Sequence, residues 1–145
     1  MDKEALNQQL LQLMKALEQE GFVDEKFRLC HSLKEISGPF FFVELIPTFL
    51  TDVRTVLRDI TAALDQSVVD YNDMYEYCIK LRGSATSIGA SQMKNACSNL
   101  RQAVDNKSKD GCLLALNDIK HEYFSLRSKW ETIVQLERRI VSPES

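Results

Sequence analysis

Apolar residues recur along this chain at intervals of three and four, which is the spacing of one face of an α-helix. The pattern is clearest in the last third of the chain, where one unbroken stripe predicts a single long helix. That stripe consists of Cys112, Leu116, Ile119, Tyr123, Leu126, Trp130, Ile133 and Ile140. No alternation of apolar and polar residues bounded by hairpin signals occurs, so the pattern predicts an all-α fold.

Three shorter stripes precede the long one, and each predicts another helix. They consist of Phe42, Ile46, Phe49, Val53, Val56, Ile60 and Ala63, then Met74, Cys78, Leu81, Ala85 and Ile88, and then Met93, Ala96 or Cys97, Leu100 and Val104. Pro47 lies inside the first stripe and removes the hydrogen bond to the Val43 carbonyl, so we expect a kink or a delayed start there. Because short loops join the four predicted helices, we expect an antiparallel up-down-up-down four-helix bundle.

Two additional helices are expected before the bundle. Leucines at helical spacing between residues 5 and 17 predict the first, and Gly21 is its expected C-terminal cap. Asp24 is placed to cap a second, shorter helix. The apolar residues of this second helix are Phe27, Leu29 and Leu33.

A break at Ser37-Gly38-Pro39 separates these helices from the bundle, and Pro39 suits the first turn of the next helix. We therefore expect two N-terminal helices in residues 1–37, packed on a four-helix bundle in residues 38–141. We expect residues 142–145 to form a short tail. The chain of 145 residues has the length of one domain with a sizeable core.

The composition narrows the class of protein. The formal net charge of -3 gives no sign of a nucleic acid or an anionic membrane as partner, and no apolar run is long enough to span a membrane. Charged residues directly follow Met1, so we expect no signal peptide. The four cysteines form no C-x-x-C pair, which excludes zinc-ribbon and thioredoxin sites. We expect an intracellular protein with reduced, mostly packed thiols.

The stretch from Tyr77 to Ala90, YCIKLRGSATSIGA, contains a run of small side chains at Gly83, Ser84, Ala85, Thr86, Ser87 and Gly89. Since the stripe from Met74 to Ile88 faces the core, Ile79 faces away from it, with Gly83 one turn later. A glycine inside a helix costs about 0.5–1 kcal/mol relative to alanine, so another interaction must benefit from it. Close packing by another helix of the chain or a kink would explain it, but the exposed face favours the approach of a partner protein.

The segment Leu81 to Ala90, LRGSATSIGA, resembles the signature of plant histidine-containing phosphotransfer (HPt) proteins, the middle carriers of the cytokinin two-component relay. The family pattern is His-x-Phe-Lys-Gly-Ser-Ser-Ser-Ser-Ile-Gly-Ala, followed by a helix similar to KNAC at residues 94–97. The resemblance covers most of the chain. Its other segments are EGFVDEKF at residues 20–27, ALDQ at 63–66, EYF at 122–124 and QLE at 135–137.

The resemblance implies a site in which an exposed histidine nitrogen attacks an aspartyl phosphate. It implies that Arg82 is the cation that balances the charge of the phosphate. It also implies that Gly83 is the glycine that leaves room for the partner to approach. The acceptor position, four residues before this glycine, is Ile79, which has no nucleophile and no titratable proton. The chain therefore resembles the pseudo-HPt members of the family. The residues that we expect to dock a receiver domain are Tyr75, Ile79, Lys80, Arg82, Gly83, Ser84 and Thr86.

By the same resemblance, the expected partners are receiver domains of hybrid sensor histidine kinases and response regulators. The protein would bind them without accepting phosphate and would compete with active carriers as a negative regulator. We expect a binding module rather than an enzyme, a monomer without cofactor, located in the cytoplasm and the nucleus.

Two alternatives remain open at this point, namely an active carrier that uses another histidine and a helical adaptor that has lost receiver binding. His31 and His121 are the two histidines. His31 has Glu35 four residues later, which would repel phosphate, and His121 has no cation three residues later. Asp118 shares a helix face with His121, but no second set of ligands accompanies them, so we expect no metal site.

Overall fold

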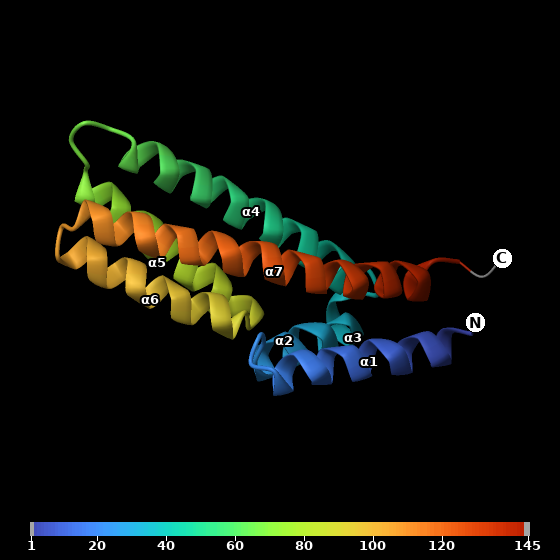
Figure 1. Cartoon of the computed structure of the whole chain (residues 1–145). Helices are drawn as coiled ribbons and strands as arrows, with labels where there is room; N and C mark the ends of the chain where they lie inside the picture. Colours follow the sequence, from blue (N-terminus) through green and yellow to red (C-terminus); the bar gives the residue numbers. More distant parts are fainter. Residues whose placement is uncertain (1, 144–145) are drawn as a thin grey trace.

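The computed structural model describes residues 2–143 and places them in seven helices with no strand (Figure 1). The helices are α1 (Lys3–Gln19), α2 (Glu25–Ser32), α3 (Lys34–Ser37), α4 (Phe41–Leu64), α5 (Tyr71–Ile88), α6 (Ser91–Asp105) and α7 (Lys109–Val141). α4 packs against α5 and α7, and α6 packs against the same two helices, so α5 and α7 lie diagonally across the bundle. The predicted all-α four-helix bundle is confirmed. Part of the expected tail, residues 144–145, lies outside the described residues.

The predicted apolar stripes form the core. Every residue of the four stripes is buried except Ala63, Ala96 and Ile140, which are partly buried. α7 extends beyond the ends of α5 and α6, and its second half packs against α1 (Figure 1). Trp130 lies in this half, fully buried, and its ring stacks on that of Phe27 with 4.7 Å between the ring centroids. Phe27 thereby attaches α2 to the bundle, because aromatic pairs of this kind bury large apolar surfaces.

The N-terminal region differs from the prediction in having a third helix. The chain turns at Leu33, so a separate four-residue helix, α3, follows α2. Of the three apolar residues named for the second helix, Phe27 is buried, whereas Leu29 and Leu33 have 56% and 39% of their surfaces exposed. The reason is geometric: at about 100° per residue they lie roughly 200° and 240° around the helix from Phe27. The inward face that follows Phe27 instead carries Cys30 and His31, which are partly buried.

The structure places the two prolines near the start of α4 at different positions relative to the helix. α4 begins at Phe41, with Phe40 as its N-cap, so Pro39 precedes the helix instead of occupying its first turn. Pro47 lies within α4, six residues after its start, so of the two expected outcomes, a kink or a delayed start, the delayed start is excluded. The buried residues Phe42 and Ile46 show why, because their burial holds the segment before Pro47 in the bundle.

A buried ion pair attaches α3 to α7. Lys34 Nζ lies 2.7 Å from Oε2 and 2.9 Å from Oε1 of Glu137, whose side chain is fully buried. The His31 ring stands edge-on to that of Phe42, with 5.0 Å between the centroids. Burial lowers the pKa of His31, the charge of Lys34 lowers it further, and Glu137 acts in the opposite direction. His31 therefore belongs to the packing of α2 and α3 against the bundle.

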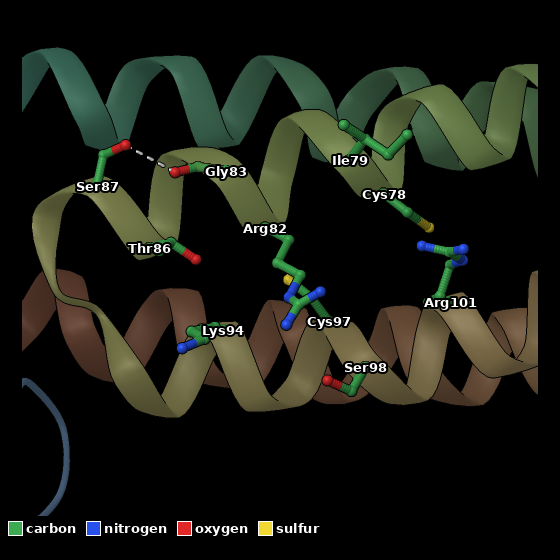
Figure 2. Close-up of a pocket in the computed structure, with 10 residues that line it drawn as sticks. All are labelled: Cys78, Ile79, Arg82, Gly83, Thr86, Ser87, Lys94, Cys97, Ser98 and Arg101. Atoms are coloured by element: carbon green, nitrogen blue, oxygen red, sulfur yellow. Dashed lines mark hydrogen bonds between the residues drawn. The ribbon is translucent and has the colours of Figure 1, made fainter.

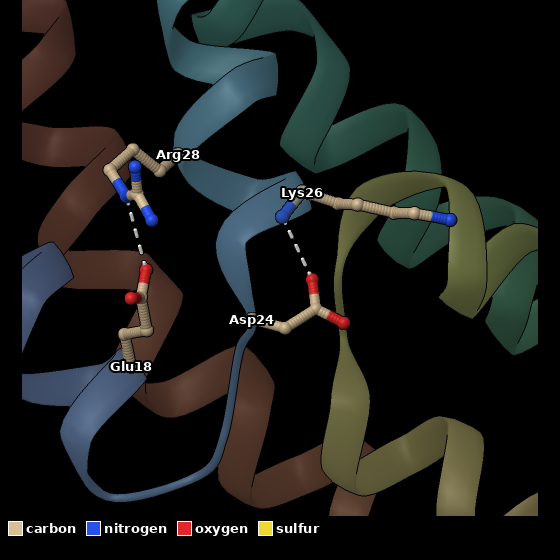
Figure 3. A network of polar contacts seen from close by, with 4 residues as sticks. All are labelled: Glu18, Asp24, Lys26 and Arg28. Carbon is tan, nitrogen blue, oxygen red and sulfur yellow. Dashed lines mark hydrogen bonds and ion pairs between the residues drawn. The ribbon is translucent and has the colours of Figure 1, made fainter.

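The α5–α6 turn packs tightly against the start of α2. Gly89 has a φ of +81°, and its carbonyl accepts a hydrogen bond of 2.9 Å from the Asp24 amide. A Cβ at Gly89 would lie 2.4 Å from the Phe27 nitrogen and 2.6 Å from Asp24 Oδ1. Asp24 in turn caps α2 through the Lys26 amide, and Arg28 of α2 pairs with Glu18 of α1 at 3.3 Å (Figure 3). Gly89 therefore has a structural role that joins the N-terminal helices to the bundle.

Gly89→Ala should lower the free energy of unfolding by about 2–4 kcal/mol, because the left-handed backbone and the contact with α2 both oppose a side chain. The matched control is Gly83→Ala, which places the same methyl group in a helix interior with open space around it. That control should be stabilised by about 0.5–1 kcal/mol. Urea denaturation measures both, and equal effects of the two substitutions would contradict the close contact at Gly89.

Candidate functional site

The outward face of α5 carries an exposed isoleucine. Ile79 has 50% of its surface exposed, whereas its neighbour Cys78 and the following Leu81 are buried. The helical spacing accounts for this, because residues 78 and 81 point to the core and residue 79 points away. The predicted exposure of Ile79 is confirmed.

Gly83 forms an open notch one turn after Ile79. Within the described part of the chain, a Cβ at Gly83 would meet no atom within 4 Å beyond its own helix, and α5 runs unbroken from Tyr71 to Ile88. Neither close packing by another helix of the chain nor a break of the helix explains this glycine. The Ser87 hydroxyl donates a 2.9 Å hydrogen bond to the Gly83 carbonyl (Figure 2), so that carbonyl is satisfied locally while the surface above it stays open.

Two grooves flank this part of α5. The groove between α5 and α6 has a volume of about 620 Å³, and the groove between α5 and α4 has a volume of about 430 Å³. Ile79, Gly83 and Ser87 line both of them, and together they form the crest between the two grooves. We call this crest with its two grooves the α5 ridge. A partner that covers the crest would also contact side chains of α4 and α6.

The α5 ridge brings together six of the seven residues that the sequence singled out. Arg82 and Thr86 lie in the groove toward α6, whereas Lys80 and Ser84 lie in the groove toward α4. Tyr75 lies in neither groove. Its ring lies under the Arg101 guanidinium, with 4.3 Å between the guanidinium carbon and the ring centroid, so it supports one wall of the α5–α6 groove.

The α5–α6 groove is lined by three cations from two helices. Figure 2 shows Arg82 reaching from α5 toward α6, where Lys94 and Arg101 line the opposite wall. Arg101 is paired with Asp105 at 3.4 Å. Among residues 2–143, Arg82 and Lys94 have no carboxylate partner. The groove therefore has an excess of positive charge beside the apolar surface of Ile79, which favours an anionic or acidic partner.

The sequence reasoning missed the contribution of α6 to this site. Lys94, Ser98 and Arg101 are spaced by four and three, so they share one face of α6. That face lies beside the core stripe of Met93, Cys97 and Leu100, and the same periodicity could have identified it. The periodicity could not identify the helix that lies opposite this face of α6.

The other reactive side chains near the α5 ridge are not arranged for chemistry at neutral pH. Burial raises the pKa of Cys78 to about 11 and that of Cys97 to about 12, with Arg82 acting in the opposite direction on Cys97. Both thiols therefore stay protonated and are poor nucleophiles. His31 and His121 lie outside both grooves, and the Nε2 atom of His31 is buried without a hydrogen-bond partner among the described residues. Within residues 2–143, no three His, Cys, Asp or Glu side chains are placed to hold a metal ion.

Comparison with known proteins shows which family this chain is similar to. The family model described as "Hpt domain" matches residues 44–132. Histidine-containing phosphotransfer protein 2 of Oryza sativa subsp. japonica is 36% identical over 94% of this chain and 92% of its own length. Pseudo histidine-containing phosphotransfer protein 5 of the same organism is 31% identical over 92% of this chain and 88% of its own length. Relatives of both kinds are thus similar to the chain at comparable identity.

The fold agrees with solved structures of the same group. The X-ray structure of a histidine-containing phosphotransfer protein from rice superposes with a TM-score of 0.90 at 34% identity, covering 97% of this chain and 99% of that one.

In the part of the chain that the structure describes, no helix has the length and apolar character needed to cross a membrane.

Proposed function

The chain belongs to the plant family of histidine-containing phosphotransfer proteins, whose members act in two-component phosphorelays with receiver domains, and we propose that it is a pseudo member. In this proposal it docks receiver domains through the α5 ridge and accepts no phosphoryl group from them. The observation that carries the proposal is the exposed Ile79 between two open grooves, at the position that the sequence signature assigns to the acceptor histidine.

The chemistry of the transfer supports the loss of phosphate acceptance. A phosphorelay step forms a bond between an imidazole nitrogen and phosphorus while the bond from phosphorus to the receiver's aspartyl oxygen breaks. The attacking nitrogen must offer a lone pair, and the isoleucine side chain holds only carbon and hydrogen. Ile79 cannot perform this attack, and the two buried thiols beside it are protonated at neutral pH.

The surface around Ile79 supports continued binding of receivers. Its crest offers apolar contact through Ile79 and open space above Gly83. Arg82 and Lys94 supply positive charge for an acidic partner pocket, and charges placed in this way increase the rate of association and the specificity of binding. A protein with this surface and without the acceptor would occupy receivers that active carriers need.

The remaining features follow from this role as proposals. The partners are receiver domains of hybrid sensor histidine kinases and of response regulators, and the protein competes for them as a negative regulator of cytokinin signalling. It acts as a monomer in the cytoplasm and the nucleus, the compartments in which these partners are expected. An active carrier that uses another histidine is less well supported, because the Nε2 atom of His31 is buried and His121 lies on α7, which forms neither groove.

A competition assay tests the proposal. Radiolabelled phosphate is transferred from a phosphorylated receiver domain to an active histidine-containing carrier, in the presence of increasing amounts of this chain. We expect the initial rate of transfer to fall as this chain is added and to recover when more receiver is supplied. An unchanged rate at amounts of this chain well above those of the active carrier would show that it does not occupy the receiver.

A further inference from the structure

A groove on the opposite side of the bundle, between α4 and α7, combines an apolar floor with charged rims. It has a volume of about 660 Å³, and the two helices that form it lie side by side (Figure 1). Its floor includes the buried Leu57 and Tyr123, and Phe124 stands beside them with 58% of its surface exposed. The Tyr123 hydroxyl donates a 3.1 Å hydrogen bond to the Leu50 carbonyl, which fixes the floor of the groove.

The groove continues toward the start of α7. A smaller cavity of about 410 Å³ adjoins it, because Thr61, Asp65 and Lys120 line both. Leu113, with 45% of its surface exposed, extends the apolar surface there. From Leu113 to Arg127 the groove follows α7 for about 21 Å, which is the length of roughly four helical turns.

The rims of this groove carry the same sign of charge on both sides. Arg54 and Arg58 line the groove from α4, and Lys120 and Arg127 line it from α7, whereas Asp65 is the one carboxylate among the described residues that line it. Among residues 2–143, none of these four cations is paired with a carboxylate. In a chain with a formal net charge of -3, this is a local concentration of unpaired positive charge.

We propose that the α4–α7 groove docks an amphipathic helix of a partner protein, with acidic residues on both sides of its apolar face. An apolar floor of this length fits residues at helical spacing, and the two cationic rims complement acidic flanks. A second copy of this chain fits poorly, because its own α4–α7 groove carries the same charge. A polyanion such as RNA also fits poorly, since the floor between the rims is apolar. The proposal does not depend on the receiver-docking function, because it uses none of the residues of the α5 ridge.

The probe is a synthetic helical peptide of about 16 residues, with leucines on one face and glutamates on both flanks, and a matched peptide with lysines in place of the glutamates. Two-dimensional NMR titration of the full chain locates the binding site, and fluorescence anisotropy measures the affinity. We expect the glutamate peptide to bind with a dissociation constant of about 10–100 μM and to shift resonances of α4 and α7. The lysine peptide should bind at least about 10-fold more weakly, and salt should weaken the binding of the glutamate peptide.

Variants of the chain separate specific docking from general attraction. Arg58→Glu combined with Arg127→Glu should weaken binding of the glutamate peptide by at least about 10-fold. Arg138→Glu combined with Arg139→Glu makes the same change of charge on exposed residues outside the groove and should leave the affinity unchanged. Equal binding of both peptides, equal effects of both double variants, or shifts confined to the α5 ridge would overturn the proposal. So would preferential binding at this groove to vesicles of anionic phosphatidylserine or to single-stranded RNA.

Discussion

Gly83→Leu is expected to lower receiver binding by about 100-fold while the melting temperature stays the same or rises slightly. The notch above Gly83 is open, and among the described residues a Cβ there would have no atom within 4 Å beyond its own helix, so the first carbon of the leucine side chain enters open space. Leucine also favours a helix interior over glycine by about 0.8 kcal/mol. The new side chain would instead occupy the space through which a receiver must approach Ile79. Calorimetric titration with a receiver domain and thermal melts measure the two effects separately.

Two control variants show whether shape or charge dominates at this position. Gly83→Ala fills less of the notch and should reduce binding less than leucine does. Arg82→Ala removes an exposed charge from the rim, so it should weaken binding modestly, and mainly at low salt, where screening is weak. If Gly83→Leu binds a receiver with the affinity of the unaltered chain, the notch has no part in docking, and the proposed function loses its main physical support.

Ile79→His is expected to convert the chain into a phosphoryl acceptor, at least in part. Half of the surface of Ile79 is exposed, so an imidazole at this position would be accessible to a receiver's aspartyl phosphate. Arg82 and Lys94 line the adjacent groove and could balance the charge of the transferred phosphate. The new product would be a phosphohistidine, whose label is stable in base and lost in acid. Incubation with a radiolabelled phosphorylated receiver, followed by acid and base treatment, detects it.

Ile79→Gln is the matched control, because glutamine offers hydrogen bonds but no nucleophilic ring nitrogen. It should remain unlabelled while binding the same receiver. A folded Ile79→His variant that binds the receiver and never becomes labelled would show that more than the acceptor is missing. The cause would then be sought in Pro47 or in the aromatic residues Phe40 to Phe42, which lie on the helix beside the α5 ridge or just before it.

The helices of the bundle could be predicted from the sequence because burial alone sets their apolar spacing. The long stripe of α7 and the stripe of α5 are buried almost entirely, as helical geometry requires. The spacing of Phe27, Leu29 and Leu33 indicated no inward face, and the short helix and the turn there leave Leu29 and Leu33 exposed. Short segments contain too few turns for the periodicity to identify the inward side.

Gly83 and Gly89 show that the sequence could not distinguish a glycine that leaves a surface open from one that packs against another helix. Both lie in the segment that identified the family, six residues apart, yet Gly83 is open to solvent and Gly89 contacts the start of α2. The contact of Gly89 is with residues more than sixty positions earlier in the chain, and no local pattern encodes it. Likewise, spacing on α5 predicted which residues share its outward face, but the walls supplied by α4 and α6 depend on the packing of the bundle. The role of these residues in docking receivers stays a prediction.

The most direct test of the proposed function measures binding and phosphate acceptance in one sample of the unaltered chain. The chain is mixed with a radiolabelled phosphorylated receiver at concentrations at which calorimetry detects their complex, and the two proteins are then separated and counted. We expect a complex to form and the chain to carry no label, because Ile79 offers no lone pair and His31 and His121 lie outside the α5 ridge. Acid-labile, base-stable label on the chain, located at His31 or His121 by mass spectrometry, would contradict the account.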